Sequence, residues 1–397
     1  DQVEGLGSRS VLLSDARGLV LAAPVTAPSS SPPFSNSAMD GYAVRWADVQ
    51  ETSKSNPVHL PVAFVIAAGD GEKRSLKPGS AARIMTGAPM PEGADTVVMR
   101  EDTQESDDEV TFLSVPEAKG ANVRREGAYF TVGQPLFKAG HQITAGSIGV
   151  LASLNLCEVT TFRRPRVAII STGDELVPLG RPAGAGQIVN SSSFMLRALV
   201  EDCGAEAVVM PIARDTVESC RSVFDEALAT ADAVVSLGGV SVGDFDVVKT
   251  VMAEVCAGLD FWQVKMKPGK PLAFGLANGK PLFGLPGNPV SSFVCFLQFV
   301  RPALRKMAGA SAPYTLETVS ARLSKDVRSP EWRADYQRGV LSGSDGEWSF
   351  EPFADQSSGN LVSLAVCNGL AVVPDGVGAL RAGDPVAVER IPAGWRG

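Results

Sequence analysis

Short apolar runs alternate with longer amphipathic segments through the middle of the chain. The run at 234–237 is rich in β-branched residues and too short for a helix, which is typical of a buried strand. Thr216 is a suitable N-cap and Gly204 a suitable C-cap for neighbouring helices. This order predicts a three-layer α/β domain over 163–310 with a mostly parallel sheet. The expected strands are 167–170, 208–212, 234–237 and 262–266, and the expected helices are 192–203, 216–229, 247–255 and 291–307.

On either side of this domain, apolar and polar positions alternate over short spans that Gly and Pro clusters separate. Such spans are typical of strands. We expect a small β-rich domain over 34–130 and a C-terminal β-barrel over 311–397. Residues 1–33 and 131–162 have a mixed pattern, with a short helix and a strand expected in the first segment and helical spacing at 144–156 in the second. We pair these two segments as one discontinuous linker domain.

The composition of the 397-residue chain narrows the class of protein. Hydrophobic residues make up 45% and charged residues 20%, which is typical of a globular protein with large cores. A formal net charge of −8 without any Lys/Arg run gives no support to nucleic-acid binding. No apolar run approaches the roughly 20 residues that span a membrane, and the first residues lack a signal-peptide pattern. We therefore expect neither nucleic acid nor a membrane as a partner.

Cysteine and histidine usage narrows the chemistry further. The six cysteines are scattered and form no CxxC pair, so neither a zinc cluster nor a disulfide framework is expected. A reducing cytoplasm fits this pattern. The two histidines, His59 and His141, lie far apart in polar contexts, and we expect both at the surface. Histidine-based catalysis therefore has little support.

Charged loops follow the expected strands of the α/β domain. The carboxyl ends of parallel strands meet at one edge of a sheet, where ligands of such sheets bind. Carboxylates from separate strands suit Mg²⁺, whose remaining ligands are water and phosphate oxygens. Neighbouring lysines suit an oxyanion. The acidic residues on these loops are Asp174, Glu175, Asp215, Asp244 and Asp246, and the basic ones are Lys265, Lys267 and Lys270.

Glycine is frequent in the same loops, in the stretch 238–243 and in Gly284-Leu-Pro-Gly-Asn-Pro289. Backbone N–H groups of such loops approach an anion closely, and a following helix start adds partial positive charge. Neither stretch matches a Walker A or GxGxxG pattern, so ATP hydrolysis and nicotinamide binding lack specific support. Helix capping and solvated turns would explain any one of these residues alone. Together they predict a magnesium-assisted site for a phosphate or nucleotide-like anion.

Outside this domain, Arg124 and Arg125 form a pair that can reach an anion, although surface solvation is the ordinary role of such a pair.

Six motifs, in order along nearly the whole chain, resemble the molybdopterin molybdenumtransferase family, which includes MoeA and the E domain of gephyrin. Each motif is weak alone, and the order of all six makes the resemblance specific. It implies four domains, the first of them discontinuous and used for dimerisation, in an elongated homodimer with sites between subunits. The motifs are Ser35-Asn-Ser-Ala-Met-Asp-Gly-Tyr-Ala-Val44, Arg83-Ile-Met-Thr-Gly-Ala88, Ser171-Thr-Gly-Asp-Glu-Leu176, Gly238-Gly-Val-Ser-Val-Gly243, Lys267-Pro-Gly-Lys-Pro271 and Gly284-Leu-Pro-Gly-Asn-Pro-Val290.

The resemblance implies an activity in molybdenum cofactor biosynthesis. Molybdenum from molybdate would be inserted into adenylylated molybdopterin with release of AMP, and a divalent cation, usually Mg²⁺, would assist. The dithiolene sulfurs belong to the pterin, so the protein needs no cysteine ligand. Besides a second copy of the chain, the adenylyltransferase that acts upstream is an implied partner.

The resemblance also implies roles for single residues. Asp40 and Thr86, from the small β-rich domain, would face the α/β domain of the partner subunit. Metal ligands would be Glu175, Asp215 and Asp246, which also belong to the catalytic set with Asp40, Thr86, Lys267 and Lys270. Substrate-binding roles fall to Gly238, Gly239, Ser241, Gly243, Lys265, Pro286, Gly287, Asn288, Arg124, Arg338 and Ser358.

Three positions depart from the family pattern. Ser35, Tyr129 and Asn190 stand where members commonly carry an aspartate, so we expect a less acidic cleft. Two other functions stay open, because fold does not fix function. One is a non-catalytic molybdopterin-binding or scaffold protein of the same fold, and the other is a different phosphotransferase. Molybdate-dependent AMP release distinguishes the transferase from both.

Overall fold

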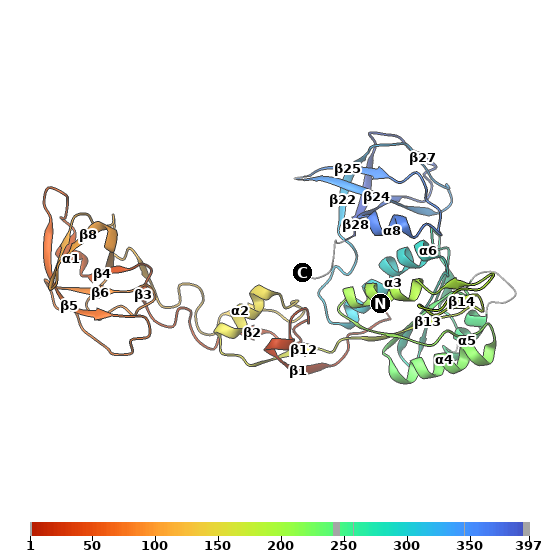
Figure 1. Ribbon diagram of the computed structural model, residues 1–397, viewed down its shortest axis with the longest axis horizontal. Coiled ribbons are helices and arrows are strands. Elements are labelled where there is room, and N and C mark those ends of the chain that lie inside the picture. Colours follow the sequence, from red (N-terminus) through yellow and green to blue (C-terminus); the bar gives the residue numbers. More distant parts are fainter. Residues whose placement is uncertain (1, 241–246, 257, 345, 392–397) are drawn as a thin grey trace. The chain divides into compact units, whose positions relative to one another are not determined.

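The structure is a computed structural model that describes residues 2–240, 247–256, 258–344 and 346–391 (Figure 1). The chain divides into two compact units, one of Asp1–Ala23 with Ala139–Gly397 and the other of Pro24–Lys138. No helix in the described ranges combines the length and the apolar character needed to cross a membrane.

A six-stranded sheet forms the centre of the α/β domain, in the order β16-β13-β17-β21-β20-β18. The first four strands in that order run parallel, whereas β20 and then β18 each run antiparallel to the strand before. The prediction of a mostly parallel sheet is therefore confirmed. The strands are β13 (Arg166–Ser171), β16 (Glu206–Val209), β17 (Ala233–Leu237), β18 (Phe261–Gln263), β20 (Pro271–Ala277) and β21 (Lys280–Leu285).

Helices cover both faces of this sheet, as Figure 1 shows. Val167 and Ile169 of β13 pack in one core with α3, α6 and α7, while Ala168 and Ile170 pack in a second core with α4 and α5. Successive side chains of a strand point to opposite faces, so a strand covered on both sides is apolar throughout. The three-layer prediction is confirmed. The helices are α3 (Ser192–Asp202), α4 (Val217–Thr230), α5 (Val247–Val255), α6 (Pro289–Cys295) and α7 (Arg301–Met307).

The prediction of one continuous helix over 291–307 is wrong in one respect. A π-helical turn, Phe296–Val300, separates α6 from α7. Pro302 follows this turn and has no N–H to donate to a carbonyl four residues earlier. A π turn shifts the hydrogen-bond pattern, so the chain continues in a helical path past the proline.

Thr216 caps α4 as predicted, and its side chain accepts a hydrogen bond from the Ser219 backbone N–H at 3.2 Å. We expect Thr216→Ala to reduce the free energy of unfolding of this domain by about 1 kcal/mol, because that N–H loses its partner. Thr216→Ser keeps the hydroxyl and serves as the control, with a change within about 0.5 kcal/mol. Thermal denaturation followed by circular dichroism measures both variants, and equal losses in the two would contradict the capping role.

The strands after α7 close into a barrel in the order β24-β25-β22-β28-β26, with β26 pairing back to β24. Phe350 is fully buried in its core beside Leu341 and Val388. The predicted C-terminal barrel is confirmed. Its strands are β22 (Thr318–Leu323), β24 (Ala334–Ser344), β25 (Glu347–Pro352), β26 (Gly369–Val373) and β28 (Pro385–Arg390).

One further strand joins the barrel from the α/β domain. It is β19 (Met266–Lys267), which runs parallel to the beginning of β24 and places Lys267 opposite Asp335. The loop of the α/β domain that carries Lys265, Lys267 and Lys270 is thereby attached to the barrel.

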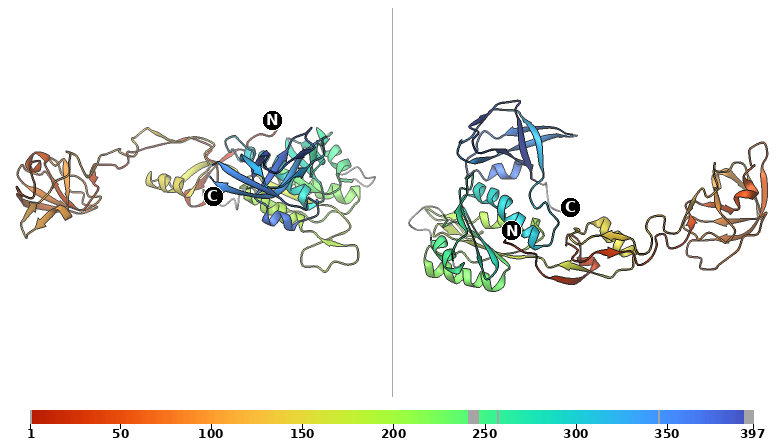
Figure 2. Two further views of the ribbon diagram at one scale, coloured as in Figure 1. Left: turned by 90° about the horizontal axis from the view of Figure 1, so that it is seen from above. Right: turned by 180° about the vertical axis from the view of Figure 1, so that it is seen from behind.

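The unit Pro24–Lys138 contains the small β-rich domain that the alternating pattern predicts. Its six-stranded sheet has the order β7-β4-β6-β5-β9-β8 and mixes parallel with antiparallel pairs. These strands, drawn in orange, form one compact body in both views of Figure 2. They are β4 (Gly41–Val44), β5 (Val58–Ile66), β6 (Ala81–Ile84), β7 (Thr96–Met99), β8 (Thr103–Glu105) and β9 (Glu109–Phe112).

The short helix expected near the N-terminus is wrong. The segment is strand β1 (Ser8–Leu12) and a 3₁₀ turn, and β1 pairs antiparallel with β12 (Glu158–Phe162). This pairing joins residues about 150 positions apart, and local sequence carries no signal for it. In the second segment, Thr144 caps α2 (Ala145–Ser153), where helical spacing was expected. The domain boundaries themselves stay a prediction.

Candidate active site

A cavity of about 480 Å³ opens where β13, β17 and β21 end. Its walls come from the loops that follow these three strands and from the beginnings of α3 and α6. This is the edge of the sheet at which the sequence predicts a ligand. The structure brings six of the predicted site residues to its lining, namely Glu175, Asp215, Gly238, Gly239, Gly287 and Asn288.

Two carboxylates belong to this lining. Asp215 Oδ2 accepts a hydrogen bond from the Asp174 backbone N–H at 3.1 Å, which ties the loop after β13 to the segment before α4. The Glu175 carboxylate folds back over Gly173, where an added Cβ would lie 2.4 Å from Oε2, so a side chain at position 173 would displace this carboxylate. Both acidic side chains are exposed and therefore accessible to a ligand.

The described part of the chain holds no group of three or more His, Cys, Asp and Glu side chains that could bind a metal ion. The third predicted metal ligand, Asp246, lies outside the described residues, as do Ser241 and Gly243. The two described carboxylates alone offer hard oxygen donors of the kind that Mg²⁺ binds together with water and phosphate oxygens.

The turn after β17 depends on two glycines. Gly238 and Gly239 have φ angles of +86° and +63°, a region that residues with a Cβ rarely adopt. An added Cβ at Gly239 would also lie 2.6 Å from Val248 Cγ2 of α5. The chain therefore turns tightly beside the cavity, and its backbone stays open to a close approach by a ligand.

Helix beginnings add partial positive charge to the same space. Asn288 is the N-cap of α6 and Pro289 its first residue, and both line the cavity. Ser191 and Ser192 line it at the beginning of α3. Unpaired N–H groups at helix N-termini attract anions. The cavity thus combines two carboxylates with an anion-binding backbone, an arrangement suited to an anion that shares a cation with the protein.

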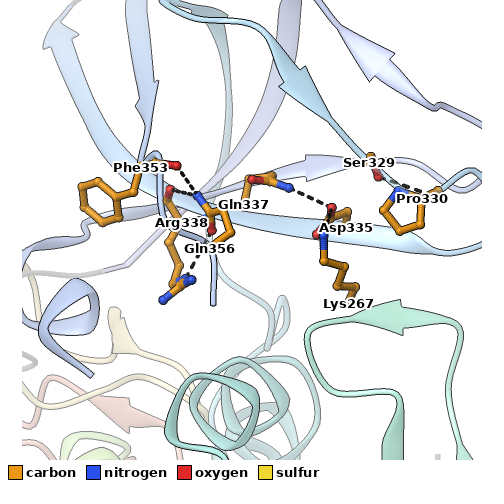
Figure 3. Close-up of polar contacts among 8 residues, drawn as sticks. All are labelled: Lys267, Ser329, Pro330, Asp335, Gln337, Arg338, Phe353 and Gln356. Carbon is orange, nitrogen blue, oxygen red and sulfur yellow. Dashed lines mark hydrogen bonds and ion pairs between the residues drawn. The ribbon is translucent and has the colours of Figure 1, made fainter. Parts of the chain in front are cut away.

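The predicted lysines occupy a different place in the structure. Lys267 Nζ lies 3.2 Å from Asp335 Oδ2, whose carboxylate is buried and also accepts from Gln337 Nε2 at 2.7 Å (Figure 3). Lys265 and Lys270 are exposed, and Lys270 Nζ lies 5.7 Å from the centre of the Trp332 ring. As far as the described residues define the cavity, its lining does not include these lysines or Pro286.

Arg338, predicted to bind an oxyanion, is only 1% exposed and holds a loop of the barrel (Figure 3). Gln356 pairs with it twice, since Oε1 accepts from the Arg338 backbone N–H at 3.1 Å and Nε2 donates to the Arg338 carbonyl at 2.8 Å. Burial lowers the pKa of this guanidinium below its usual value. Its side chain donates to Gln356 Oε1, to the carbonyls of Asp355, Ser357 and Asn360, and to Ser363 Oγ.

The loop that Arg338 organises reaches the cavity region through Ser358. The Ser358 carbonyl accepts a hydrogen bond from the backbone N–H of Val290, the second residue of α6, at 3.1 Å. Arg338 and Ser358 therefore belong to one connected structure that touches the beginning of α6.

The second unit brings Asp40 and Thr86 into direct contact. Asp40 Oδ1 accepts from the Thr86 backbone N–H at 2.6 Å and from Thr86 Oγ1 at 2.8 Å. These two hydrogen bonds, first the backbone one, lower the pKa of Asp40 below its ordinary 3.8. In the same unit, an Arg124 N–H donates to the Ala38 carbonyl at 3.3 Å.

We expect Thr86→Val to raise the pKa of Asp40 toward 3.8, because the variant keeps the backbone bond and loses the hydroxyl bond. A depressed carboxyl pKa stabilises the folded state above the unfolded pKa, and this contribution disappears as the pH falls through the folded pKa. As the pH falls, Thr86→Val therefore loses this stabilising contribution of Asp40 at a higher pH than the wild type does. Carboxyl ¹³C shifts of Asp40 against pH measure the change. Thr86→Ser is the control, and an unchanged pKa in Thr86→Val would contradict the role of the hydroxyl.

The three departures from the family pattern lie in different settings. Ser35 Oγ accepts from the Glu126 backbone N–H at 3.1 Å, and the Tyr129 side chain is 66% exposed. Asn190 is buried and lines the cavity. Sequence reasoning named Asn190 only as a departure that makes the cleft less acidic, and it gave no site role to Thr172 or Ser191. The only signal was their position just after an expected strand or just before an expected helix.

Comparisons with known protein families cover almost the whole chain. The MoeA N-terminal region (domain I and II) matches residues 2–155, the probable molybdopterin binding domain matches 168–306, and the MoeA C-terminal region (domain IV) matches 320–391.

Individual relatives agree with this assignment. The molybdopterin molybdenumtransferase of Nostoc sp. is 42% identical over 95% of this chain and 87% of its own length. Molybdopterin molybdenumtransferase 2 of Mycobacterium tuberculosis is 39% identical over 96% of this chain and 94% of its own. The crystal structure of the molybdopterin biosynthesis MoeA protein from Pyrococcus horikoshii superposes with a TM-score of 0.83 at 31% identity, covering 98% of this chain and 96% of that one. The chain belongs to the molybdopterin molybdenumtransferase family.

Proposed function

We propose that this protein inserts molybdenum from molybdate into adenylylated molybdopterin and releases AMP, as a step of molybdenum cofactor biosynthesis. The observation that carries the proposal is the cavity at the carboxyl edge of the sheet, where Glu175 and Asp215 lie beside a glycine turn and two helix beginnings. Such a cavity suits a phosphoanhydride held with a divalent cation.

Magnesium is part of this proposal. Glu175 and Asp215 would hold it, with Asp246 as the third ligand, and the ion would neutralise charge as the phosphoanhydride breaks. Backbone N–H groups of Gly239 and of the beginning of α3 would orient the phosphate oxygens, because Pro289 has no N–H and the Gly238 and Val290 N–H groups donate to backbone carbonyls. The chain would then act mostly by positioning and electrostatic stabilisation.

The remaining predicted residues are assigned as follows. Lys267 and Lys270 would bind molybdate or the pyrophosphate linkage, and the contact with Asp335 would keep Lys267 in position. Arg338 would act through the loop that it holds, and Ser358 through its contact with α6. Asp40, Thr86 and Arg124 would contribute from the partner subunit of a homodimer. A cytoplasmic location belongs to the same proposal.

Release of AMP from adenylylated molybdopterin tests the proposal. Purified protein is mixed with that compound and Mg²⁺, with and without molybdate, and AMP is quantified by chromatography. We expect release that depends on molybdate and disappears on removal of Mg²⁺ with EDTA. Tight binding without AMP release under any cation would favour a scaffold. Release that is independent of molybdate would favour a different phosphotransferase.

A further inference from the structure

Asn190 is a buried polar side chain on the wall of the cavity. It follows β15 (Ile188–Val189), its backbone N–H donates to the Val177 carbonyl at 3.0 Å, and its side chain precedes the first turn of α3. The residue is only 6% exposed, and it lines the cavity together with Glu175 and Asp215.

The orientation of the Asn190 carboxamide is fixed by its neighbours. Oδ1 accepts from the Ser193 backbone N–H at 3.4 Å and from Ser171 Oγ at 3.3 Å. A backbone N–H only donates, so the oxygen faces Ser193 and the NH₂ group points elsewhere. Among the described residues, no protein acceptor takes a hydrogen bond from Nδ2. Nδ2 is also not among the solvent-inaccessible side-chain atoms that lack a hydrogen-bond partner. The NH₂ group is therefore the part of this side chain that is open to the cavity.

A neutral donor at this position has an electrostatic consequence. An aspartate would fill the same space, but it would present only acceptors and would add a negative charge beside Glu175 and Asp215. An anion bound here would be repelled unless a cation intervened. Asparagine instead offers N–H groups next to the beginning of α3, which itself favours negative charge.

We propose that Asn190 is a specificity-determining residue that donates a hydrogen bond from Nδ2 to an anionic oxygen of the substrate. It thereby lets the cavity bind this anion with less dependence on a divalent cation than an aspartate at the same position would. The inference rests on the proposed function, because it takes the phosphate-bearing substrate as the occupant.

Asn190→Asp tests this contact, because the variant keeps both acceptor contacts and changes only the group that faces the cavity. Affinity for adenylylated molybdopterin is measured by isothermal titration calorimetry without molybdate, once in EDTA and once in Mg²⁺. In EDTA we expect the variant to bind at least about 10-fold more weakly, since a hydrogen bond to a charged group contributes about 1.5–3 kcal/mol. In Mg²⁺ the difference should shrink to less than about threefold, because a cation shared by the aspartate and the anionic oxygen replaces the lost hydrogen bond and offsets the added charge.

Two further variants separate this effect from changes in folding. Asn278→Asp adds the same charge at the exposed turn between β20 and β21, away from the cavity edge, and should bind like the wild type in both buffers. Asn190→Ala removes the donor without adding charge and should weaken binding by a similar factor in EDTA and in Mg²⁺. Melting temperatures of all variants report on the fold.

A ratio of affinities between wild type and Asn190→Asp that is the same in EDTA and in Mg²⁺ would overturn the inference. Titrations with AMP and with adenosine run in parallel, so that the contact is tested even if the pterin compound does not bind. Asn190→Asp should bind AMP more weakly than the wild type and adenosine equally well. Equal effects on both ligands would also overturn the inference. Failure of the wild type to release AMP would count against the proposed function alone.

Discussion

Replacing Glu175 by glutamine is expected to lower molybdate-dependent AMP release by about 100-fold or more. Stabilisation by a metal ion acting as a Lewis acid is worth several kcal/mol, and a loss of about 3 kcal/mol corresponds to about 100-fold in rate. Glutamine has nearly the same size, so it fits the space over Gly173 that the carboxylate occupies. Because Glu175 is exposed, the free energy of unfolding should change by no more than about 0.5 kcal/mol.

The measurement is kcat for AMP release over a range of Mg²⁺ concentrations, with circular dichroism as the check on folding. Loss of one ligand should also raise the Mg²⁺ concentration that gives half-maximal rate. Glu226→Gln makes the same chemical change on the exposed side of α4, away from the cavity lining, and should leave both quantities as in the wild type. A rate for Glu175→Gln within about threefold of the wild type would remove Glu175 from the metal-binding set.

The fold was predictable wherever local signals decide it. The hydroxyl of Thr216 determines where α4 begins, and a strand covered on both faces is apolar throughout. Two predictions, those for the N-terminal segment and for the helix at 291–307, were wrong because such local signals do not decide the structure there. The strand β1 exists because β12 pairs with it, and the helix after Asn288 changes to a π turn before Pro302. The first depends on a distant partner, and the second on how one missing N–H is accommodated.

The candidate site was predictable to the same extent. Strand ends placed Glu175, Asp215 and Gly238 at one edge of the sheet, since the order of elements alone predicts that edge. The contact of Asp40 with Thr86 depends on the register in which Gly41 faces Ile84, and no spacing rule provides that register. The attachment of Lys267 to the barrel through β19 is equally non-local.

Arg338→Met is expected to destabilise the barrel by about 3 kcal/mol or more. The guanidinium is buried and supplies hydrogen bonds to three backbone carbonyls and two side-chain oxygens around residues 355–363. Each buried acceptor left without a partner costs about 1–3 kcal/mol, although water will reach some of them. Methionine fills most of the volume, so the loss arises from hydrogen bonds more than from a cavity.

This loss should extend beyond the barrel, because the loop carries Ser358, whose carbonyl holds the Val290 N–H at the beginning of α6. Hydrogen–deuterium exchange read by mass spectrometry should show faster exchange over 353–366 and 288–293 in the variant, with KM for adenylylated molybdopterin raised more than kcat is lowered. Arg322→Met is the control, since Arg322 is exposed on β22 and donates only to the Gly383 carbonyl among the described residues. Arg338→Lys should recover part of the protection, as lysine keeps the charge but lacks the planar fork of donors. If exchange at 288–293 stays unchanged while 353–366 loosens, Arg338 supports the barrel alone and has no influence on the beginning of α6.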